Sequence, residues 1–271
     1  MIKYLIFDLD GTIATKFNRI HKKVISAIIR ARKKGFKIAI ATGRHINSVL
    51  KIAELIKCDI YSEYIICLNG GSIWKYNDSG IEKIYQETIH LEMAKNLFDL
   101  AKSLNISISG YSTNGYIYTN NIKGVKQKFL SKRTKMETKI VDKNFNFEIF
   151  KFIAWGTNKK IDLLINECKK MQLEIYKFSY VPGTKNIEIC PQNVNKVSAI
   201  KKICQIENLN NYEVAYFGDG DNDIKALEWV GHSVSMLNGS KEAKKTASFI
   251  TRKSNKKGGV GFYIEENLLR E

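Results

Sequence analysis

The sequence predicts an α/β protein in which a doubly wound parallel sheet is interrupted by an inserted α+β module. Two patterns support this prediction. Short apolar runs alternate with amphipathic helical segments at both ends of the chain, which is typical of a parallel sheet covered on both faces. The alternation stops near residue 81 and returns near residue 197. We therefore expect a discontinuous core domain at 1–81 and 187–271, with an inserted domain at 82–186.

The opening apolar run, Tyr4–Phe7, predicts a buried strand with a polar tip made of Asp8, Asp10, Gly11 and Thr12. Side chains two residues apart on a strand share a face, so Asp8 and Asp10 can reach one point. Gly11 then lets the chain turn away without a blocking side chain. Adjacent carboxylates repel each other unless a cation or a shared proton relieves them, and Mg²⁺ is the usual cation for such oxygen ligands. An ordinary strand followed by an Asp-Gly turn is the alternative.

The same pattern of strand, polar tip and helix is then repeated. The expected elements are a helix over 20–34, a strand over 36–41 ending in Thr42-Gly43-Arg44, a helix over 46–56, and a strand over 64–68 ending in Asn69-Gly70-Gly71. In open parallel sheets, binding sites form outside the carboxyl ends of the strands. Three successive polar tips at strand ends therefore predict a site at that edge of the sheet.

The middle of the chain is rich in turns and reads as an independent α+β module. We expect helices over 91–104 and 159–171, strands over 106–110, 116–119 and 150–155, an exposed basic segment over 123–135, a turn at Pro182-Gly183, and a strand over 186–190 that leads out of the module. The core alternation then returns with a helix over 197–206, a strand over 213–217, a helix over 224–229, a strand over 233–236, a helix over 241–246 and a last strand near Phe249.

An acidic loop, residues 218–223, follows the strand over 213–217. Its alternating aspartates suggest a calcium-binding loop, but counting from Asp219, Ile224 and Val230 occupy the positions that require glycine and an acid. The calcium-loop interpretation therefore fails. If this strand lies beside the first one, Asp219 comes near Asp8 and Asp10, and several carboxylates in one crevice make a hard-cation site.

Two further polar positions suit a phosphate group. Thr42 and Gly43 at a helix start offer a hydroxyl and backbone N–H groups. Lys196, also at a helix start, can supply a positive charge to the same group. Each residue alone is commonplace, and their order along the chain gives them weight.

That order, Asp8-Leu9-Asp10-Gly11-Thr12, then Thr42, Lys196, and Gly218-Asp219 with Asn222-Asp223, resembles the four motifs of the haloacid dehalogenase superfamily. The large insertion between the second and third motifs resembles the Cof-like branch, whose α/β cap sits there. The resemblance implies a Rossmann-like core with an inserted cap domain. Two departures lie beside Lys196: Val197 stands where the branch often has glycine, and Asn195 where serine is frequent.

By this resemblance each motif residue has an expected role. Asp8 is the nucleophile and Asp10 the general acid and base. The remaining expected roles are phosphate or substrate binding for Thr42, Gly43, Arg44, Lys196 and Asn222, Mg²⁺ binding for Asp8, Asp10, Asp219 and Asp223, and leaving-group selectivity for Asn69, Arg44 and residues near Lys185.

The expected function is a Mg²⁺-dependent phosphatase that acts on a small phosphorylated metabolite, a sugar phosphate or a phosphorylated cofactor, through an aspartyl-phosphate. A phosphomutase that uses the same phosphoaspartate is the nearest alternative. A non-catalytic protein that binds nucleic acid through its basic surface is a more distant one. The sequence does not indicate the oligomeric state.

The amino-acid composition restricts the expected binding partners and the expected cellular location. The formal charge of +17 comes from 44 basic and 27 acidic residues, but the lysines are spread over many helical segments, so no specific nucleic-acid partner is expected. No apolar run approaches membrane-spanning length, and Asp8 and Asp10 precede any possible secretory core. The five scattered cysteines indicate buried thiols in a reducing compartment. A cytoplasmic location is therefore expected.

Overall fold

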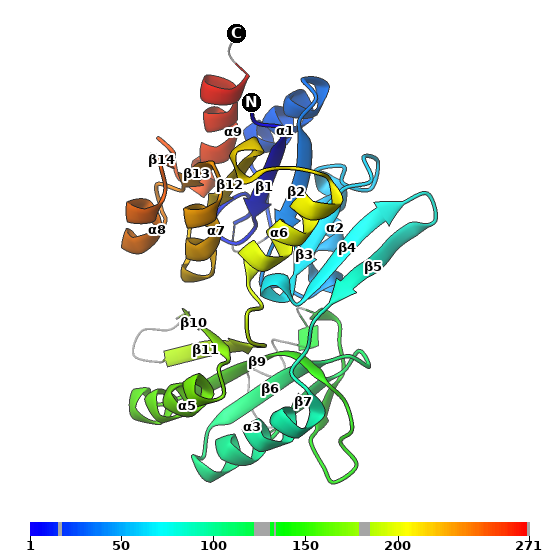
Figure 1. The fold of residues 1–271 in the computed structure, drawn as a ribbon, viewed down its shortest axis with the longest axis vertical. Coiled ribbons are helices and arrows are strands. Elements are labelled where there is room, and N and C mark those ends of the chain that lie inside the picture. The colour runs from blue at the N-terminus through cyan, green and yellow to red at the C-terminus, as the bar shows by residue number, and fades with distance from the viewer. Residues whose placement is uncertain (16–17, 122–130, 133, 179–184, 270–271) are drawn as a thin grey trace. The chain divides into compact units, whose positions relative to one another are not determined.

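The computed structural model describes residues 1–15, 18–121, 131–132, 134–178 and 185–269. The chain forms two compact units, one built from Met1–Tyr85 and Asn195–Glu271 and the other from Gln86–Val194 (Figure 1). The predicted turn at Pro182-Gly183 and most of the predicted basic segment over 123–135 lie outside the described residues. Among the helices in the described ranges, none has both the length and the apolar character needed to cross a bilayer.

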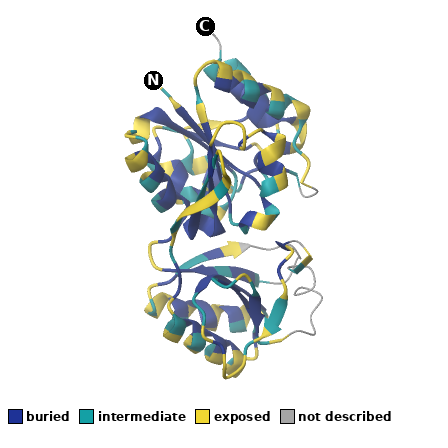
Figure 2. Cartoon of the chain, turned by 90° about the vertical axis from the view of Figure 1, so that its right-hand side faces the viewer, coloured by how far each residue is buried: buried dark blue, intermediate teal, exposed yellow. Residues whose placement is uncertain are grey.

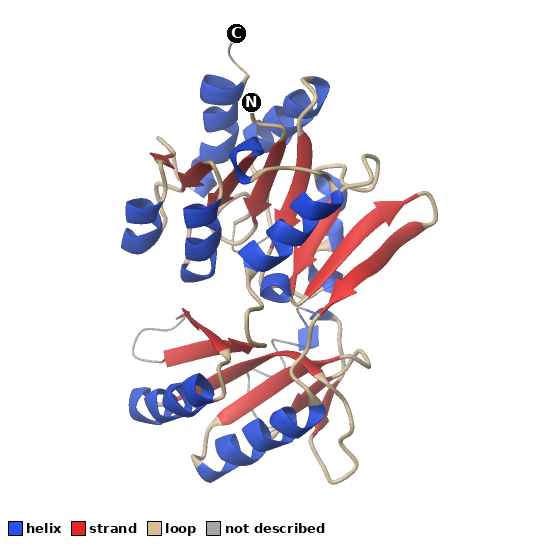
Figure 3. Cartoon of the chain, in the orientation of Figure 1, coloured by secondary structure: helices blue, strands red, loops and turns tan. Residues whose placement is uncertain are grey.

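The first unit is organised around an eight-stranded sheet with the order β14-β13-β12-β1-β2-β3-β4-β5. Its strands are labelled in Figure 1 and drawn in red in Figure 3. Neighbouring strands from β14 to β3 are parallel, and β4 is antiparallel to β3. The strands are β1 (Tyr4–Asp8), β2 (Lys37–Ala41), β3 (Tyr64–Cys67), β4 (Ser72–Asn77), β5 (Gly80–Gln86), β12 (Val214–Gly218), β13 (His232–Ser235) and β14 (Phe249–Ile250). The predicted parallel core is confirmed, whereas β4 and β5 were not expected as strands.

Helices cover both faces of this sheet. The helices are α1 (Lys22–Lys33), α2 (Leu50–Leu55), α6 (Lys196–Ile206), α7 (Ile224–Trp229), α8 (Lys241–Thr246) and α9 (Gly259–Tyr263). Helices α6, α7 and α8 share an apolar core with Tyr4 and Ile6 of β1. Phe217 of β12, which points to the opposite face, contacts Tyr263 of α9, and α9 packs against α1. All five residues of β1 are consequently buried, as the dark strands in Figure 2 illustrate.

The second unit is a six-stranded sheet with the order β10-β11-β9-β6-β7-β8. Its elements are α3 (Leu91–Ser103), β6 (Ser107–Ser112), β7 (Ile117–Thr119), β8 (Thr138–Ile140), β9 (Ile149–Gly156), α5 (Asn158–Lys170), β10 (Glu174–Phe178) and β11 (Lys185–Cys190). The apolar faces of α3 and α5 pack on one face of the sheet, where Phe98, Leu164 and Phe152 belong to one core. The predicted α+β character of this part of the chain is therefore present.

The residues at which one unit ends and the other begins differ from the predicted domain boundaries. The strand expected to lead out of the module is β11, which pairs with both β9 and β10 inside the six-stranded sheet. The units accordingly divide at Gln86 and at Asn195, rather than at 82 and 187. An apolar strand sequence does not specify which sheet will take it up, and this is why the boundary was misplaced.

Candidate active site

Three parallel strands of the first unit bring their polar tips to one edge of the sheet. β1 lies between β12 and β2, with Phe7 opposite Phe217 and Asp8 opposite Ala41. The residues that follow these positions, Asp219 in the acidic loop and Thr42 after β2, must therefore emerge at the level of Asp8. The sequence placed these tips together correctly.

Three carboxylates converge at this edge. Asp8, Asp219 and Asp223 each offer an oxygen atom, and these oxygens all lie within 4.8 Å of one another. Asp8 is only 4% exposed and Asp223 is fully buried. The carboxylate of Asp10, which the sequence predicted among the metal ligands, is not part of this described cluster.

One buried ammonium group offsets part of this negative charge. Lys196 Nζ lies 2.6 Å from Asp8 Oδ1 and 2.6 Å from Asp223 Oδ1, and its side chain is inaccessible to solvent. Asn195 caps the helix by accepting a hydrogen bond from the Ser198 backbone N–H, and Ser198 Oγ accepts one from the Asn195 backbone N–H. The departures from the family pattern at Asn195 and Val197 therefore leave a well-formed helix start beneath the lysine.

Asp223 anchors the acidic loop. Its Oδ2 accepts hydrogen bonds from the backbone N–H groups of Asp219 and Gly220, at 2.8 and 2.9 Å. Its Oδ1 accepts one from the Tyr216 hydroxyl at 2.6 Å, in addition to the one from Lys196. Both oxygens are thus engaged twice. The sequence did not single out Tyr216, because a tyrosine within an apolar strand reads as core, and only its hydroxyl next to an acidic loop could have suggested this contact.

Asp219 lies directly against the turn that follows β1. Its Oδ1 accepts a hydrogen bond of 3.0 Å from the Thr12 hydroxyl. A Cβ atom added to Gly11 would lie 2.1 Å from Asp219 Oδ2, and Gly11 has a φ of +90°. Glycine is therefore required here for two reasons, its left-handed backbone and the close approach of the carboxylate.

Burial opposes the ionised state of these acids. Burial, together with the charge of Asp223, raises the pKa of Asp219 from 3.8 to about 7. Burial also raises the pKa of Asp8 well above its ordinary 3.8, although Lys196 acts in the opposite direction. For Lys196, burial lowers the pKa, but the carboxylates of Asp223 and Asp8 outweigh it, so the group stays protonated. The single ammonium group of Lys196 therefore does not balance the negative charge of the three carboxylates.

One oxygen of the cluster stands out. Asp8 Oδ2 is buried and has no hydrogen-bond partner among the residues that the structure describes. A buried, unpartnered carboxylate oxygen is costly unless another group contacts it. The Asp8 carboxylate and Asp219 together provide the hard oxygen donors that a divalent cation binds, so the residues present fit such an ion.

The expected acid and base, Asp10, is held by an arginine. Arg44 Nε donates to Asp10 Oδ2 at 2.7 Å, Nη2 donates to Asp10 Oδ1, and Nη1 donates to Asn18 Oδ1 at 2.7 Å. Arg44 is 6% exposed. In this structure the guanidinium predicted to contact substrate is therefore directed at Asp10, in the bidentate geometry that suits a carboxylate.

The remaining predicted positions lie at the tips of β2 and β3, in the acidic loop after β12, or in the other unit. The Thr42 hydroxyl accepts a hydrogen bond of 3.2 Å from the backbone N–H of Arg44. Asn222 Nδ2 donates to Asn69 Oδ1 at 2.9 Å, which ties the acidic loop to the end of β3. Lys185 belongs to the second unit, where its Nζ lies 2.5 Å from an Asp162 carboxylate oxygen.

Comparisons with known proteins place this architecture in a class. A family model for haloacid dehalogenase-like hydrolases matches residues 5–264. A Streptococcus pyogenes protein whose name includes the word phosphatase is 31% identical over 280 residues, covering 99% of each chain. A 5-amino-6-(5-phospho-D-ribitylamino)uracil phosphatase of Bacillus subtilis is 28% identical over 273 residues, covering 99% of this chain and 96% of that one. A haloacid dehalogenase-like hydrolase structure from Bacteroides thetaiotaomicron has a TM-score of 0.82 at 25% identity, covering 98% of this chain and 99% of that one.

The chain therefore belongs to the haloacid dehalogenase-like hydrolase family, as its four motifs and its insertion of the Cof-like type predicted. Its predicted fold class is confirmed, and so is its predicted enzyme class, a phosphoric monoester hydrolase of the haloacid dehalogenase type. Hydrolases of this family generally use a divalent metal ion, and the cluster around Asp8 could bind one.

Proposed function

We propose that the chain is a Mg²⁺-dependent phosphatase that hydrolyses a small phosphorylated metabolite through an aspartyl-phosphate on Asp8. The observation that carries this proposal is the unpartnered, buried Asp8 Oδ2 beside Lys196 and Asp219. A carboxylate nucleophile needs one oxygen free to attack, and nearby positive charge to let an anion approach. Lys196 supplies part of that charge.

Asp8 and Asp219 are the residues that would hold Mg²⁺. When bound, the ion supplies Lewis-acid charge neutralisation for the phosphoryl oxygens. Asp223 is better suited to orient Lys196 and the acidic loop, since both of its oxygens already accept two hydrogen bonds. Of the four predicted metal ligands, we therefore assign direct contact to Asp8 and Asp219, an anchoring role to Asp223, and proton transfer to Asp10.

Two successive displacements at phosphorus make up the reaction. An Asp8 carboxylate oxygen attacks phosphorus, the bond to the leaving oxygen breaks, and Asp10 gives its proton to that oxygen. Water then attacks the aspartyl-phosphate while Asp10 takes a proton from it, which releases inorganic phosphate and restores the Asp8 carboxylate. Because both Asp10 oxygens are bound by Arg44 in this structure, Asp10 must leave that ion pair in order to transfer protons.

The phosphoryl group would be held by polar groups from the start of α6 and from the tips of β2 and β12. Lys196 is already placed beside the nucleophile. Thr42 offers a hydroxyl and Gly43 a backbone N–H at the end of β2, and Asn222 offers an amide that is anchored to Asn69. These donors suit the oxygens of a phosphate monoester.

The substrate is proposed to be a sugar phosphate or a phosphorylated cofactor. The name of the Bacillus subtilis relative, which describes a phosphorylated ribityl compound, supports this class. We propose that the second unit, Gln86–Val194, is the cap domain and sets leaving-group selectivity. All five cysteines lie in the described ranges, are buried and form no disulfide, which supports the proposed cytoplasmic location.

The test is an Asp8→Asn variant assayed for inorganic phosphate release from sugar phosphates, flavin mononucleotide and pyridoxal phosphate, with and without Mg²⁺. We expect loss of turnover with an unchanged circular dichroism spectrum, because the amide is nearly the same size but a poor nucleophile. Asp221→Asn is the matched control, since Asp221 is exposed in the acidic loop. Wild-type activity in Asp8→Asn would refute the proposal. Isomerisation of a hexose phosphate without phosphate release would favour a phosphomutase.

A further inference from the structure

A second concave surface of the first unit is lined by cations. It is a hollow of about 620 Å³ formed by the chain that follows β14, together with His21 at the start of α1, Phe262 of α9 and Leu237 after β13. Four of its lining residues are basic: Arg252, Lys253, Lys256 and Lys257. No acidic residue is among the described residues that line it.

The backbone beneath these cations is fixed by buried contacts. Asn255 is 8% exposed, its backbone N–H donates to Asn238 Oδ1 at 2.8 Å, and its Nδ2 donates to the Ala14 carbonyl at 3.0 Å. Gly258 has a φ of +71°, and a Cβ atom there would lie 2.6 Å from His21 Nδ1. The segment therefore lies against the start of α1, so its lysines are carried by an ordered loop with a set conformation.

Three of the four cations are not neutralised. In the part of the chain that the structure describes, no carboxylate lies within ion-pair distance of Lys253, Lys256 or Lys257. Lys253 Nζ instead lies 3.3 Å from the centre of the Phe262 ring, a cation–π contact that leaves its full charge in the hollow.

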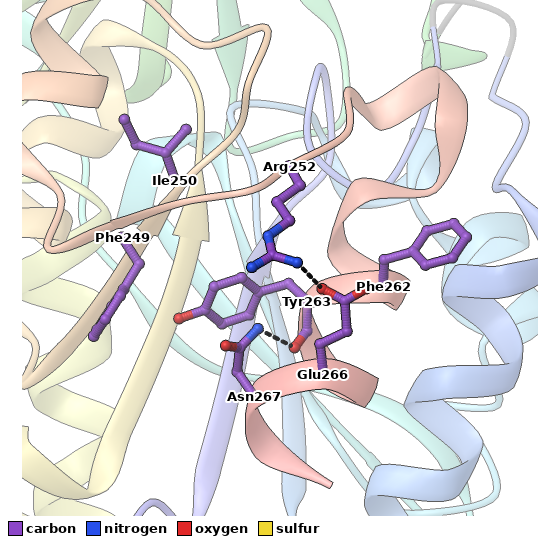
Figure 4. A pocket seen from close by; sticks show the side chains of 7 residues that line it. All are labelled: Phe249, Ile250, Arg252, Phe262, Tyr263, Glu266 and Asn267. Atoms are coloured by element: carbon purple, nitrogen blue, oxygen red, sulfur yellow. Dashed lines mark hydrogen bonds and ion pairs between the residues drawn. The ribbon is translucent and has the colours of Figure 1, made fainter. Parts of the chain in front are cut away.

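Arg252 differs from the three lysines. In the adjoining smaller cavity, of about 130 Å³, Arg252 Nη1 lies 3.7 Å from Glu266 Oε2 (Figure 4). Its charge is therefore partly compensated, and the excess charge belongs to the lysines. Like charges that line one hollow repel each other, and a bound anion reduces that repulsion.

We propose that this hollow binds a small anion that carries two or more adjacent phosphate groups, as in a pyrophosphate or triphosphate unit. Ammonium groups on flexible stems bind phosphate oxygens as point charges. The volume lies within the range of small-molecule sites, roughly 300–1,000 Å³. A nucleic-acid backbone is usually followed by a long basic stripe. A single hollow suits a compact anion better than it suits such a backbone.

The hollow is connected to the turn that follows Asp10, the proposed acid and base. Asn238, which accepts the hydrogen bond from Asn255, donates through Nδ2 to the Gly11 carbonyl at 2.8 Å. The hollow is nevertheless built from residues outside the acidic cluster, so anion binding there does not depend on the proposed phosphatase chemistry.

The test is calorimetric titration of the full chain with sodium tripolyphosphate in EDTA, which removes divalent cations. We expect saturable binding by the wild-type protein, and at least about tenfold weaker binding in the combined variant Lys253→Gln, Lys256→Gln and Lys257→Gln, because three charge-assisted contacts are lost. The matched control removes three exposed charges from the second unit, with Lys102→Gln, Lys159→Gln and Lys169→Gln, and should bind within about twofold of wild type.

Unchanged KM for p-nitrophenyl phosphate in the first variant would show that the lost binding is not at the acidic cluster. Absence of saturable binding by the wild type, or equal weakening in both triple variants, would overturn the proposal. Tighter binding of a single-stranded RNA oligonucleotide than of tripolyphosphate, lost in the same variant, would also overturn it in favour of a nucleic-acid surface. If the triple variant does not fold, Lys256→Glu takes its place, and at least about fivefold weaker binding is expected from reversing one charge.

Discussion

Replacing Asp223 by asparagine tests whether this side chain is an anchor of the acidic loop. The carboxylate accepts from Lys196, from Tyr216 and from two backbone N–H groups. In either orientation of the asparagine, the amide nitrogen faces two of these donors, so two hydrogen bonds to a charged acceptor are lost. At about 1.5–3 kcal/mol for each such bond, the sum agrees with the roughly 3–5 kcal/mol expected for breaking a buried ion pair.

The measurement is urea denaturation followed by circular dichroism, with Asp221→Asn as the control. The exposed Asp221 is expected to change the free energy of unfolding by less than about 0.5 kcal/mol, because its charge is solvated. Asp223→Asn should lower the free energy of unfolding by roughly 3–5 kcal/mol, which in a separate thermal melt corresponds to a melting temperature lower by roughly 6–20 °C. A free energy of unfolding within about 1 kcal/mol of wild type would refute the anchoring role.

A second arm separates anchoring from metal binding. If Asp219 is a direct ligand, Asp219→Asn should lose the rise in melting temperature that Mg²⁺ gives the wild-type protein. Asp223→Asn, although less stable, should keep most of that rise. The reverse result, with Mg²⁺ stabilisation retained in Asp219→Asn and lost in Asp223→Asn, would exchange the two roles.

Two further predictions concern the turn after β1 and the titration of the cluster. Gly11→Ala should lower kcat/KM by about a hundredfold, because the added Cβ would lie 2.1 Å from Asp219 Oδ2 and displace that carboxylate. The control is Gly156→Ala, whose added Cβ meets only ordinary contacts at 3.4 Å. Equal activity in the two variants would contradict this prediction. Because the pKa of Asp219 is raised to about 7, protons should compete with Mg²⁺ below that pH, so the Kd for Mg²⁺, measured by calorimetry, should rise about tenfold for each pH unit lost. A Kd that stays constant between pH 5.5 and 7 would exclude this competition.

The convergence of Asp8 and Asp219 could be predicted from the sequence, because it depends only on strand adjacency. Carboxyl ends of neighbouring parallel strands meet at one edge, and apolar runs mark where those strands are. The direction of a long side chain, by contrast, could not be predicted from the sequence. Arg44 follows a strand tip and can reach several acids, and its choice of Asp10 over a phosphate position depends on rotamers that leave no trace in the sequence pattern.

The sequence also could not predict which of the two sheets each strand joins. β11 has the alternation of any half-buried strand, and only its pairing with β9 and β10 assigns it to the second unit. The β4–β5 pair did carry a signal, since β-branched and aromatic residues lie on both sides of the turn residues over 77–80. Its position after three parallel strands made a hairpin unexpected, although an antiparallel edge on a parallel sheet is common.

The charge balance of the cluster explains why the three carboxylates, Lys196 and a divalent cation would act together. With its three carboxylates ionised and Lys196 protonated, the cluster carries a net charge of −2, since three negative charges face one positive charge. A phosphate monoester dianion approaching that charge would be repelled strongly at low dielectric. A divalent cation brings the sum to zero before the substrate enters. Under the proposed mechanism, the burial that raises the pKa of Asp8 and Asp219 would therefore make the site depend on a cation. A version of this cluster with solvated acids would lose both that requirement and the means of bringing a carboxylate to phosphorus.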